Sequence, residues 1–214
     1  MAQAARADGE RATERSRDRF LDAAAREFIE KGYESATIRS IAARAGTSLA
    51  SLTRNWTGKR ELYQQVFEAH IGIVNRAQHR AFAAWEARPD APLEELIEAL
   101  LSPVLAPRGH SDEREISHLV YSQALASPSP EVRELVMPLV SGVRDEMVRL
   151  LSKCLPSPDK QRLFLAMTII NGAYVYAQQH GERLAQGIAL DRDAIDWPAT
   201  SSRIAAMIAN GLRG

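Results

Sequence analysis

The residues best suited to chemistry lie in one short stretch, Ala42–Trp56, which reads AARAGTSLASLTRNW. Its second half combines small, hydroxyl, amide and guanidinium side chains, namely Leu49, Ala50, Ser51, Thr53, Arg54 and Asn55. Such groups fit the major groove of a DNA duplex, where arginine can bind guanine, asparagine can bind adenine, and serine or threonine can bind bases or phosphates. The stretch therefore indicates a surface that reads DNA bases.

The charge around this stretch is positive although the chain as a whole is neutral. Lys+Arg and Asp+Glu both total 27 in 214 residues. Residues 35–60 contain no acidic residue and five basic ones, Arg39, Arg44, Arg54, Lys59 and Arg60. A local excess of this kind attracts polyanions, and the N–H groups that begin predicted helices bind phosphate. We therefore add Thr37, Arg39, Ser48 and Lys59 to the predicted DNA-binding set.

Two short helices must position these side chains. Thr37 is a suitable N-cap for the first helix and Ser48 for the second, and Gly46 supplies the backbone freedom that the turn between them needs. Two short helices joined by such a turn form a helix-turn-helix. Leu52 and Trp56 share a face at i, i+4, so we expect them to anchor the second helix, which is too short to be stable alone.

Helical periodicity runs through most of the chain, and strand alternation is convincing nowhere. We predict an all-α fold of about nine helices, with residues 1–15 as a mobile arm, 16–62 as a helix-turn-helix DNA-binding domain and 63–214 as a helical ligand-binding and dimerisation domain. Ser129 and Pro130 form a helix-start signature, and Pro138 is expected to bend that helix.

The sequence contains no motif for metal binding, for nucleophilic hydrolysis or for a nucleotide phosphate loop. The five histidines show no metal-ligand spacing, no G-x-S-x-G elbow occurs, and Gly-Lys in TGKRE lacks the glycine-rich lead of a phosphate loop. We expect no metal, no cofactor and no enzymatic activity. The single Cys154, the absence of an apolar run of membrane-spanning length and the charged N-terminus predict a cytoplasmic protein without a membrane partner.

The stretch FLDAAAREFIEKGYESATIRSIAARAGTS, residues 20–48, resembles the first two helices of the TetR family of bacterial transcriptional repressors. GKRELY at 58–63 follows at the family's spacing, so the resemblance covers residues 17–67. The family commonly has glycine at Ala50, tyrosine at Thr53, histidine or tyrosine at Asn55 and phenylalanine at Trp56. These departures suggest an altered base preference. Residues 119–140 further resemble AcrR-like regulators with a helix bent at a proline.

The resemblance implies a homodimer joined mainly through the last two helices, here about residues 158–182 and 197–212, and a small-molecule pocket in the helical body. Candidates for its lining are Val74, Leu100, Leu119, Tyr121, Gln123, Met137, Phe164, Met167 and Asn171. Ordinary core packing is the alternative for each of them, because stripes at this spacing are the default pattern of a helical core. Apolar walls with a few polar side chains favour an elongated or hydrophobic effector.

We therefore predict a ligand-responsive transcriptional repressor that binds a palindrome-like DNA operator as a homodimer and is released when a small-molecule effector fills the pocket. The helix from Lys59 toward Trp85 is the expected lever. Two alternatives remain, a helical ligand-binding or adaptor protein that has lost DNA binding, and an all-α enzyme. An enzyme would need convergent titratable groups in a cleft, and the spacing of the sequence shows none.

Overall fold

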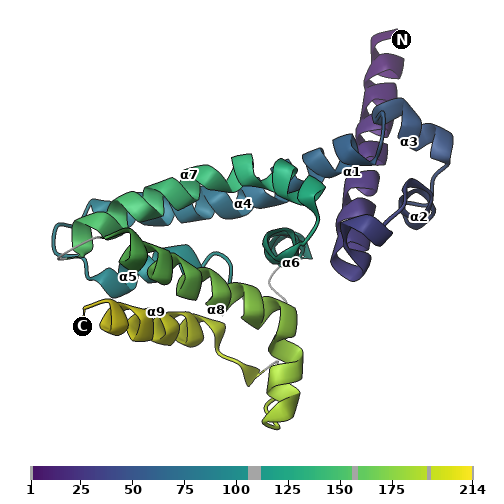
Figure 1. The fold of residues 1–214 in the computed structure, drawn as a ribbon. Coiled ribbons are helices and arrows are strands. Elements are labelled where there is room, and N and C mark those ends of the chain that lie inside the picture. The colour runs from purple at the N-terminus through teal and green to yellow at the C-terminus, as the bar shows by residue number, and fades with distance from the viewer. Residues whose placement is uncertain (1, 106–111, 156–158, 192–193, 214) are drawn as a thin grey trace. The chain divides into compact units, whose positions relative to one another are not determined.

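The computed structural model describes residues 2–105, 112–155, 159–191 and 194–213, and within these ranges it contains nine α-helices and no β-strand (Figure 1). The predicted all-α class is therefore confirmed. The helices are α1 (Ala2–Ser35), α2 (Ile38–Arg44), α3 (Leu49–Asn55), α4 (Lys59–Glu86), α5 (Leu93–Leu101), α6 (Asp112–Ala126), α7 (Pro130–Cys154), α8 (Lys160–Gly187) and α9 (Trp197–Arg213). Residue 1 of the predicted arm and residue 158 of the predicted dimer helix lie outside the described residues.

The chain divides into two compact units, residues 1–69 and 70–214. The first holds α1–α3 and the start of α4, and the second holds the rest of α4 and α5–α9. The boundary falls within α4, seven residues after the domain boundary predicted from sequence. α1 begins at Ala2 and so includes residues 2–15, which the sequence assigned to an arm. The three domain ranges stay a prediction.

Aromatic rings form the centre of the first unit. The ring of Phe28 lies 5.7 Å from that of Tyr63 and 5.1 Å from that of Phe67, and Phe20 packs edge-on against Trp56 at 5.5 Å. All five side chains are almost fully buried. Edge-to-face pairs contribute about 0.5–1.5 kcal/mol each beyond the burial of their apolar area. These rings join α1 and α4 and reach the end of α3, so they fix the frame on which the helix-turn-helix is built.

The second unit is a bundle formed by the rest of α4 and by α5–α9. α5 packs against α9 and α7, and α8 packs against α6, α7 and α9. α7 begins at Pro130 after the N-cap Ser129, as predicted, and Pro138 lies inside it. Among the described helices, none has the length and apolar character needed to cross a membrane.

Candidate nucleic-acid interface and ligand cavity

The turn between α2 and α3 is closed by backbone hydrogen bonds. Gly46 has φ 63°, a left-handed value that is costly for any residue with a Cβ. Its N–H donates to the Ala43 carbonyl at 3.1 Å, and the N–H of Thr47 donates to the Ala42 carbonyl at 3.1 Å. This pair of bonds is the Schellman motif that ends many helices, and here it turns the chain into α3. The predicted role of Gly46 is therefore confirmed.

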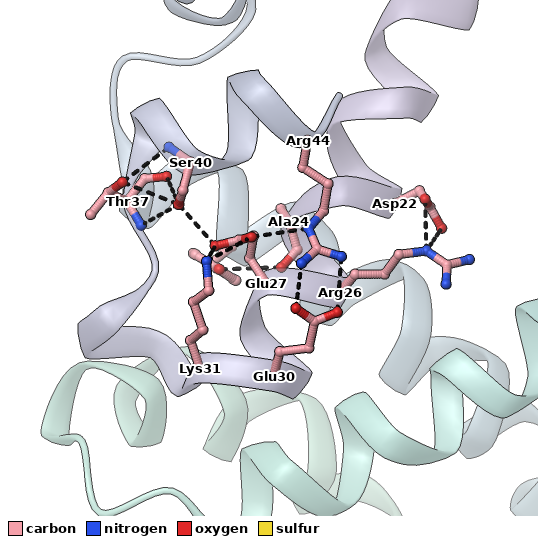
Figure 2. Close-up of polar contacts among 10 residues, drawn as sticks. Asp22, Ala24, Arg26, Glu27, Glu30, Lys31, Thr37, Ser40 and Arg44 are labelled. Atoms are coloured by element: carbon pink, nitrogen blue, oxygen red, sulfur yellow. Dashed lines mark hydrogen bonds and ion pairs between the residues drawn. The ribbon is translucent and has the colours of Figure 1, made fainter. Parts of the chain in front are cut away.

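A capping box begins α2. The side chain of Thr37 accepts from the Ser40 N–H at 3.0 Å, and the Ser40 hydroxyl accepts from the Thr37 N–H at 3.1 Å. The Ser40 hydroxyl also donates to Glu27 Oε2 on α1 at 2.8 Å (Figure 2). One serine thus closes the cap and ties α2 to α1.

Glu27 is a buried carboxylate at the centre of a polar cluster between α1 and α2 (Figure 2). It accepts from Lys31 Nζ at 2.8 Å and from Arg44 Nε at 3.0 Å, besides the Ser40 hydroxyl. Burial opposes its ionisation, but the hydrogen bonds from Lys31, Ser40 and Arg44 together lower the pKa of Glu27 below its ordinary value. The carboxylate therefore stays charged and holds the first two helices together.

The back of α3 is anchored as predicted. Leu52 is fully buried and Trp56, the C-cap residue, is 2% exposed. The Trp56 Nε1–H donates to Gln65 Oε1 on α4 at 3.0 Å, and Arg17 on α1 donates to the same oxygen at 2.8 Å. A seven-residue helix gains little from its own hydrogen bonds, so these contacts with the rest of the unit hold it in place.

The other side of α3 faces solvent. Of the ten residues predicted to bind DNA, seven are exposed, namely Thr37, Arg39, Ser48, Leu49, Ala50, Thr53 and Arg54, and three are half-buried, namely Ser51, Asn55 and Lys59. Ser48 caps α3 by accepting from the Ser51 N–H at 3.2 Å. α3 therefore presents a continuous set of side chains that a major groove can admit, with its buried side held by Leu52 and Trp56.

Two of these polar side chains already bond to their own helix. The Asn55 amide nitrogen donates to the Ser51 carbonyl at 2.9 Å, and the Thr53 hydroxyl lies 3.2 Å from the Ala50 carbonyl. A bidentate contact of asparagine with adenine needs that amide nitrogen. In this conformation the Asn55 amide nitrogen is engaged within α3, whereas the Arg54 guanidinium has no hydrogen bond in the part of the chain that the structure describes.

The fold reduces the charge excess that the sequence shows. Arg44 is paired with Glu27 and Glu30 of α1 (Figure 2). The Lys59 ammonium lies 4.2 Å from the centre of the Tyr33 ring, a contact that positions the ammonium but does not neutralise it. Among the described residues, Arg39 and Arg54 have no ion-pair partner. Glu27 and Glu30 lie before residues 35–60 in the chain and meet Arg44 only after folding, so the charge of that stretch alone overstates its positive excess.

The second unit contains a cavity of about 430 Å³. Six of the nine predicted pocket residues line it, namely Leu100, Tyr121, Met137, Phe164, Met167 and Asn171. Val74, Leu119 and Gln123 do not line it; Val74 is buried in the core, and the other two are half-buried on α6. The remaining lining residues, which the sequence analysis did not select, are Leu125, Val140, Val143, Arg144, Val148, Lys160, Leu163 and Tyr174.

The polar groups deep in the cavity bond to one another. The buried Tyr174 hydroxyl donates to Asn171 Oδ1 at 2.9 Å, and the Asn171 amide nitrogen donates to the Met167 carbonyl at 2.6 Å. The ring of Tyr121 lies 6.1 Å from that of Tyr174, and burial raises the pKa of Tyr121 to about 12. Both phenols stay neutral at physiological pH.

Arg144 and Lys160 are the charged residues among the lining side chains. Arg144 continues the stripe of Val140 and Val148 at i, i+4 intervals, so its position was visible in the sequence. Its charge sets Arg144 apart from the apolar stripes that predicted the other lining residues of the cavity.

In the described part of the chain, no cluster of three histidine, cysteine or acidic side chains could hold a metal ion.

A helix-turn-helix whose second helix is anchored by Leu52 and Trp56 and exposes its other side to solvent is typical of DNA-binding regulators. The chain belongs to the TetR family of transcriptional regulators. The model described as "Bacterial regulatory proteins, tetR family" matches residues 20–66, and the model described as "Tetracyclin repressor-like, C-terminal domain" matches residues 98–211. Together they cover most of the chain and confirm the family predicted from residues 17–67, which is a family of regulators and not of enzymes.

Solved structures share the fold along nearly the whole chain. The fatty acid degradation regulator FadR from Bacillus halodurans is 16% identical, with a TM-score of 0.63 and coverage of 92% of this chain and 96% of that one. PfmR from Thermus thermophilus is 21% identical, with a TM-score of 0.63 and coverage of 92% and 96%. The ketosteroid regulator KstR2 of Mycobacterium tuberculosis is 18% identical, with a TM-score of 0.62 and coverage of 92% and 95%. No curated protein matches the chain.

Proposed function

We propose that this regulator is a repressor that binds a palindrome-like operator as a homodimer and leaves it when a hydrophobic effector fills the cavity of the second unit. The observation that carries the DNA-binding part is the exposed face of α3, whose back is held by the buried Leu52 and Trp56. Arg54 is the base-reading residue of this proposal. Arg39, Thr37, Ser48 and Lys59 supply the phosphate contacts, which fix the position of the protein on the duplex.

The homodimer is supported by apolar side chains left exposed on the last two helices. Leu165, Ile169, Tyr176 and Leu184 lie on one face of α8 and are 44–53% exposed, and Met207 on α9 is 75% exposed. Large apolar side chains that are exposed together on one face of a helix are typical of interaction surfaces. A twofold dimer covers the same patch on both subunits and presents two copies of α3, which is why the operator should be palindrome-like.

The effector part is supported by the cavity. Its volume of about 430 Å³ falls within the range of small-molecule sites, and most of its lining is apolar. Two proteins of similar fold are described as a fatty acid degradation regulator and as a ketosteroid transcriptional regulator. Both descriptions concern hydrophobic compounds and agree with the proposed class of effector. The placement among AcrR-like regulators stays a prediction from residues 119–140.

Release of DNA requires that the effector bind one arrangement of the dimer better than the other. α4 runs without a break from Lys59 to Glu86 and contributes residues to both units, so we assign it the role of the lever. A difference of about 3 kcal/mol between the two arrangements changes operator affinity about a hundredfold.

A mobility-shift titration with DNA from upstream of the protein's own gene tests this function, with a scrambled fragment of equal length as the control. Specific retardation at low salt that disappears in the presence of an effector supports the repressor. Absence of any retardation at low salt, where phosphate contacts are strongest, refutes it and favours the alternative, a helical ligand-binding or adaptor protein.

A further inference from the structure

The cavity of the second unit is a slot that runs along α7 and α8, and Leu100 of α5 and Tyr121 and Leu125 of α6 complete its lining. Its lining recurs along α7 from Met137 to Val148 and along α8 from Leu163 to Tyr174. Each of these spans corresponds to roughly 16 Å of helix. α7 and α8 run in opposite directions (Figure 1), so Val148 and Leu163 lie toward one end of the slot, and Met137 and Tyr174 toward the other. A slot of this form fits a linear apolar chain better than a compact molecule.

The two ends of the slot differ in polarity. At the end of Tyr174 and Asn171, the polar atoms bond to each other, as described above, so this end offers a ligand mainly apolar contact. Lys160 lies toward the opposite end, just before Leu163, and Arg144 lies between Val140 and Val148. None of the lining residues that the structure describes is acidic. The site therefore carries positive charge at one end and along one side, and apolar side chains elsewhere.

Both cations are accessible to a ligand. Lys160 is exposed, and its ammonium makes no hydrogen bond or ion pair with the residues that the structure describes. Arg144 bonds to the neighbouring Asp145 at 2.9 Å, but the two side chains are 51% and 69% exposed. A solvated pair of this kind contributes little, so a ligand anion can replace Asp145 at low cost. Phe164 and Met137 are exposed although they line the cavity, which shows that the slot opens to solvent beside them.

We infer that the effector is an anionic amphiphile, with an unbranched apolar tail in the slot and a carboxylate or phosphate head held by Lys160 and Arg144. This inference rests on the proposed function, because it names the effector class for the same cavity. An anionic head near the surface keeps part of its hydration, which avoids the large desolvation penalty of a buried charge. The tail gains free energy from the apolar area that it removes from water.

Four ligands with the same ten-carbon tail separate the contributions of head and tail. They are decanoate, decyl phosphate, decan-1-ol and decyltrimethylammonium, titrated by calorimetry into the protein. We expect an anionic ligand to bind about tenfold more tightly than decan-1-ol, which corresponds to about 1.4 kcal/mol. Decanoate and decyl phosphate then distinguish a carboxylate head from a phosphate head. Equal affinity for the alcohol, preference for the cationic ligand, or no binding of any ligand at about 1 mM would overturn the inference.

Substitutions of the two lining cations test where the anionic head of the ligand binds. In Arg144→Gln/Lys160→Gln, the preference for the anion over decan-1-ol should disappear while the alcohol still binds, which also shows that the cavity is intact. Arg80→Gln/Arg133→Gln is the matched control, because it removes the same charge from exposed positions of α4 and α7 that do not line the cavity. An unchanged preference in the first variant, or an equal loss in both, contradicts the assignment.

Mobility-shift titrations with the same ligands test the class of ligand and the release of DNA independently of each other. If decanoate binds in the slot but leaves the protein on DNA, the ligand class stands and effector-driven release fails. If decan-1-ol releases DNA and the anions do not, release stands and the ligand class fails.

Discussion

The Ser40 hydroxyl donates a 2.8 Å hydrogen bond to the buried carboxylate of Glu27, so the residue that closes the capping box of α2 also fastens α2 to α1. A local helix-start signal and a tertiary contact therefore depend on one side chain. Arg44 bonds to the same carboxylate from the last turn of α2. Glu27 therefore holds both ends of this short helix. It also fixes the position at which the turn toward α3 begins.

Replacement of Glu27 by glutamine should lower the free energy of unfolding by about 2 kcal/mol, because Ser40, Lys31 and Arg44 lose a charged acceptor in a buried place. Chemical denaturation followed by circular dichroism measures the loss. Glu30→Gln is the control. Its side chain is 51% exposed and pairs with Arg44 at the surface, so it should cost less than about 1 kcal/mol. Equal losses in the two variants would show that burial of Glu27 does not matter.

Acid should weaken the same contact. The pKa of Glu27 in the folded protein lies below the ordinary value of 4.5, so its contribution to stability is fully present above that value. The contribution is lost as the pH falls through the folded pKa. Denaturation curves between about pH 6 and pH 3 should therefore show a smaller acid-dependent loss in Glu27→Gln than in the wild type. Parallel pH profiles for the two proteins would contradict this assignment.

Gly46→Ala should destabilise the helix-turn-helix by about 1–2 kcal/mol through backbone strain alone. Its φ is 63°, and a Cβ placed there would meet no atom within 4 Å, so no steric clash adds to the cost. Gly58→Ala is a matched control, because it also has open space around it but no positive φ. Thermal unfolding of the two variants should separate them; similar melting temperatures would mean that the turn tolerates a side chain.

Arg54 and Lys59 should differ in their effects on DNA binding. Arg54→Ala is expected to cost about 1–3 kcal/mol at the operator and to relax the preference for one base pair. Lys59→Ala should weaken binding to all sequences alike and reduce the slope of log affinity against log salt by about 1. Lys59 also lies over the Tyr33 ring, so Lys59→Arg, which keeps the charge and the ring contact, is its control. Unchanged affinity in both alanine variants would disprove the assigned reading face.

The homodimer can be tested on α8. Leu165→Glu/Ile169→Glu places two charges on the exposed apolar face of this helix and should convert a dimer into a monomer in analytical ultracentrifugation. Burial of unpaired carboxylates in an interface is costly, which is the reason for the expected dissociation. Leu49→Glu changes an equally exposed leucine in the first unit and should leave the oligomeric state intact. A dimer that survives the double substitution would exclude this face as the interface.

Much of the helix-turn-helix could be predicted because its signals are local. Thr37, Gly46 and Ser48 act on backbone groups within a few residues of themselves, and Leu52 and Trp56 show their shared face by an interval of four. The cavity was predicted less well. Six of its lining residues were predicted from apolar stripes, but the same stripes contain core residues such as Val74. The helical spacing of apolar residues is the same whether their side chains line a cavity or pack against another helix.

By itself, the sequence determined the helical class, the family, and the caps and turn of the helix-turn-helix. These features depend on residues only a few positions apart along the chain. Only the tertiary structure decided which charges remain available. Glu27 and Glu30 lie 17 and 14 residues before Arg44 and pair with it only when α1 and α2 pack, and Arg144 and Lys160 share one cavity only because α7 and α8 lie side by side. Electrostatic interactions depend on distance in space, and the fold sets that distance.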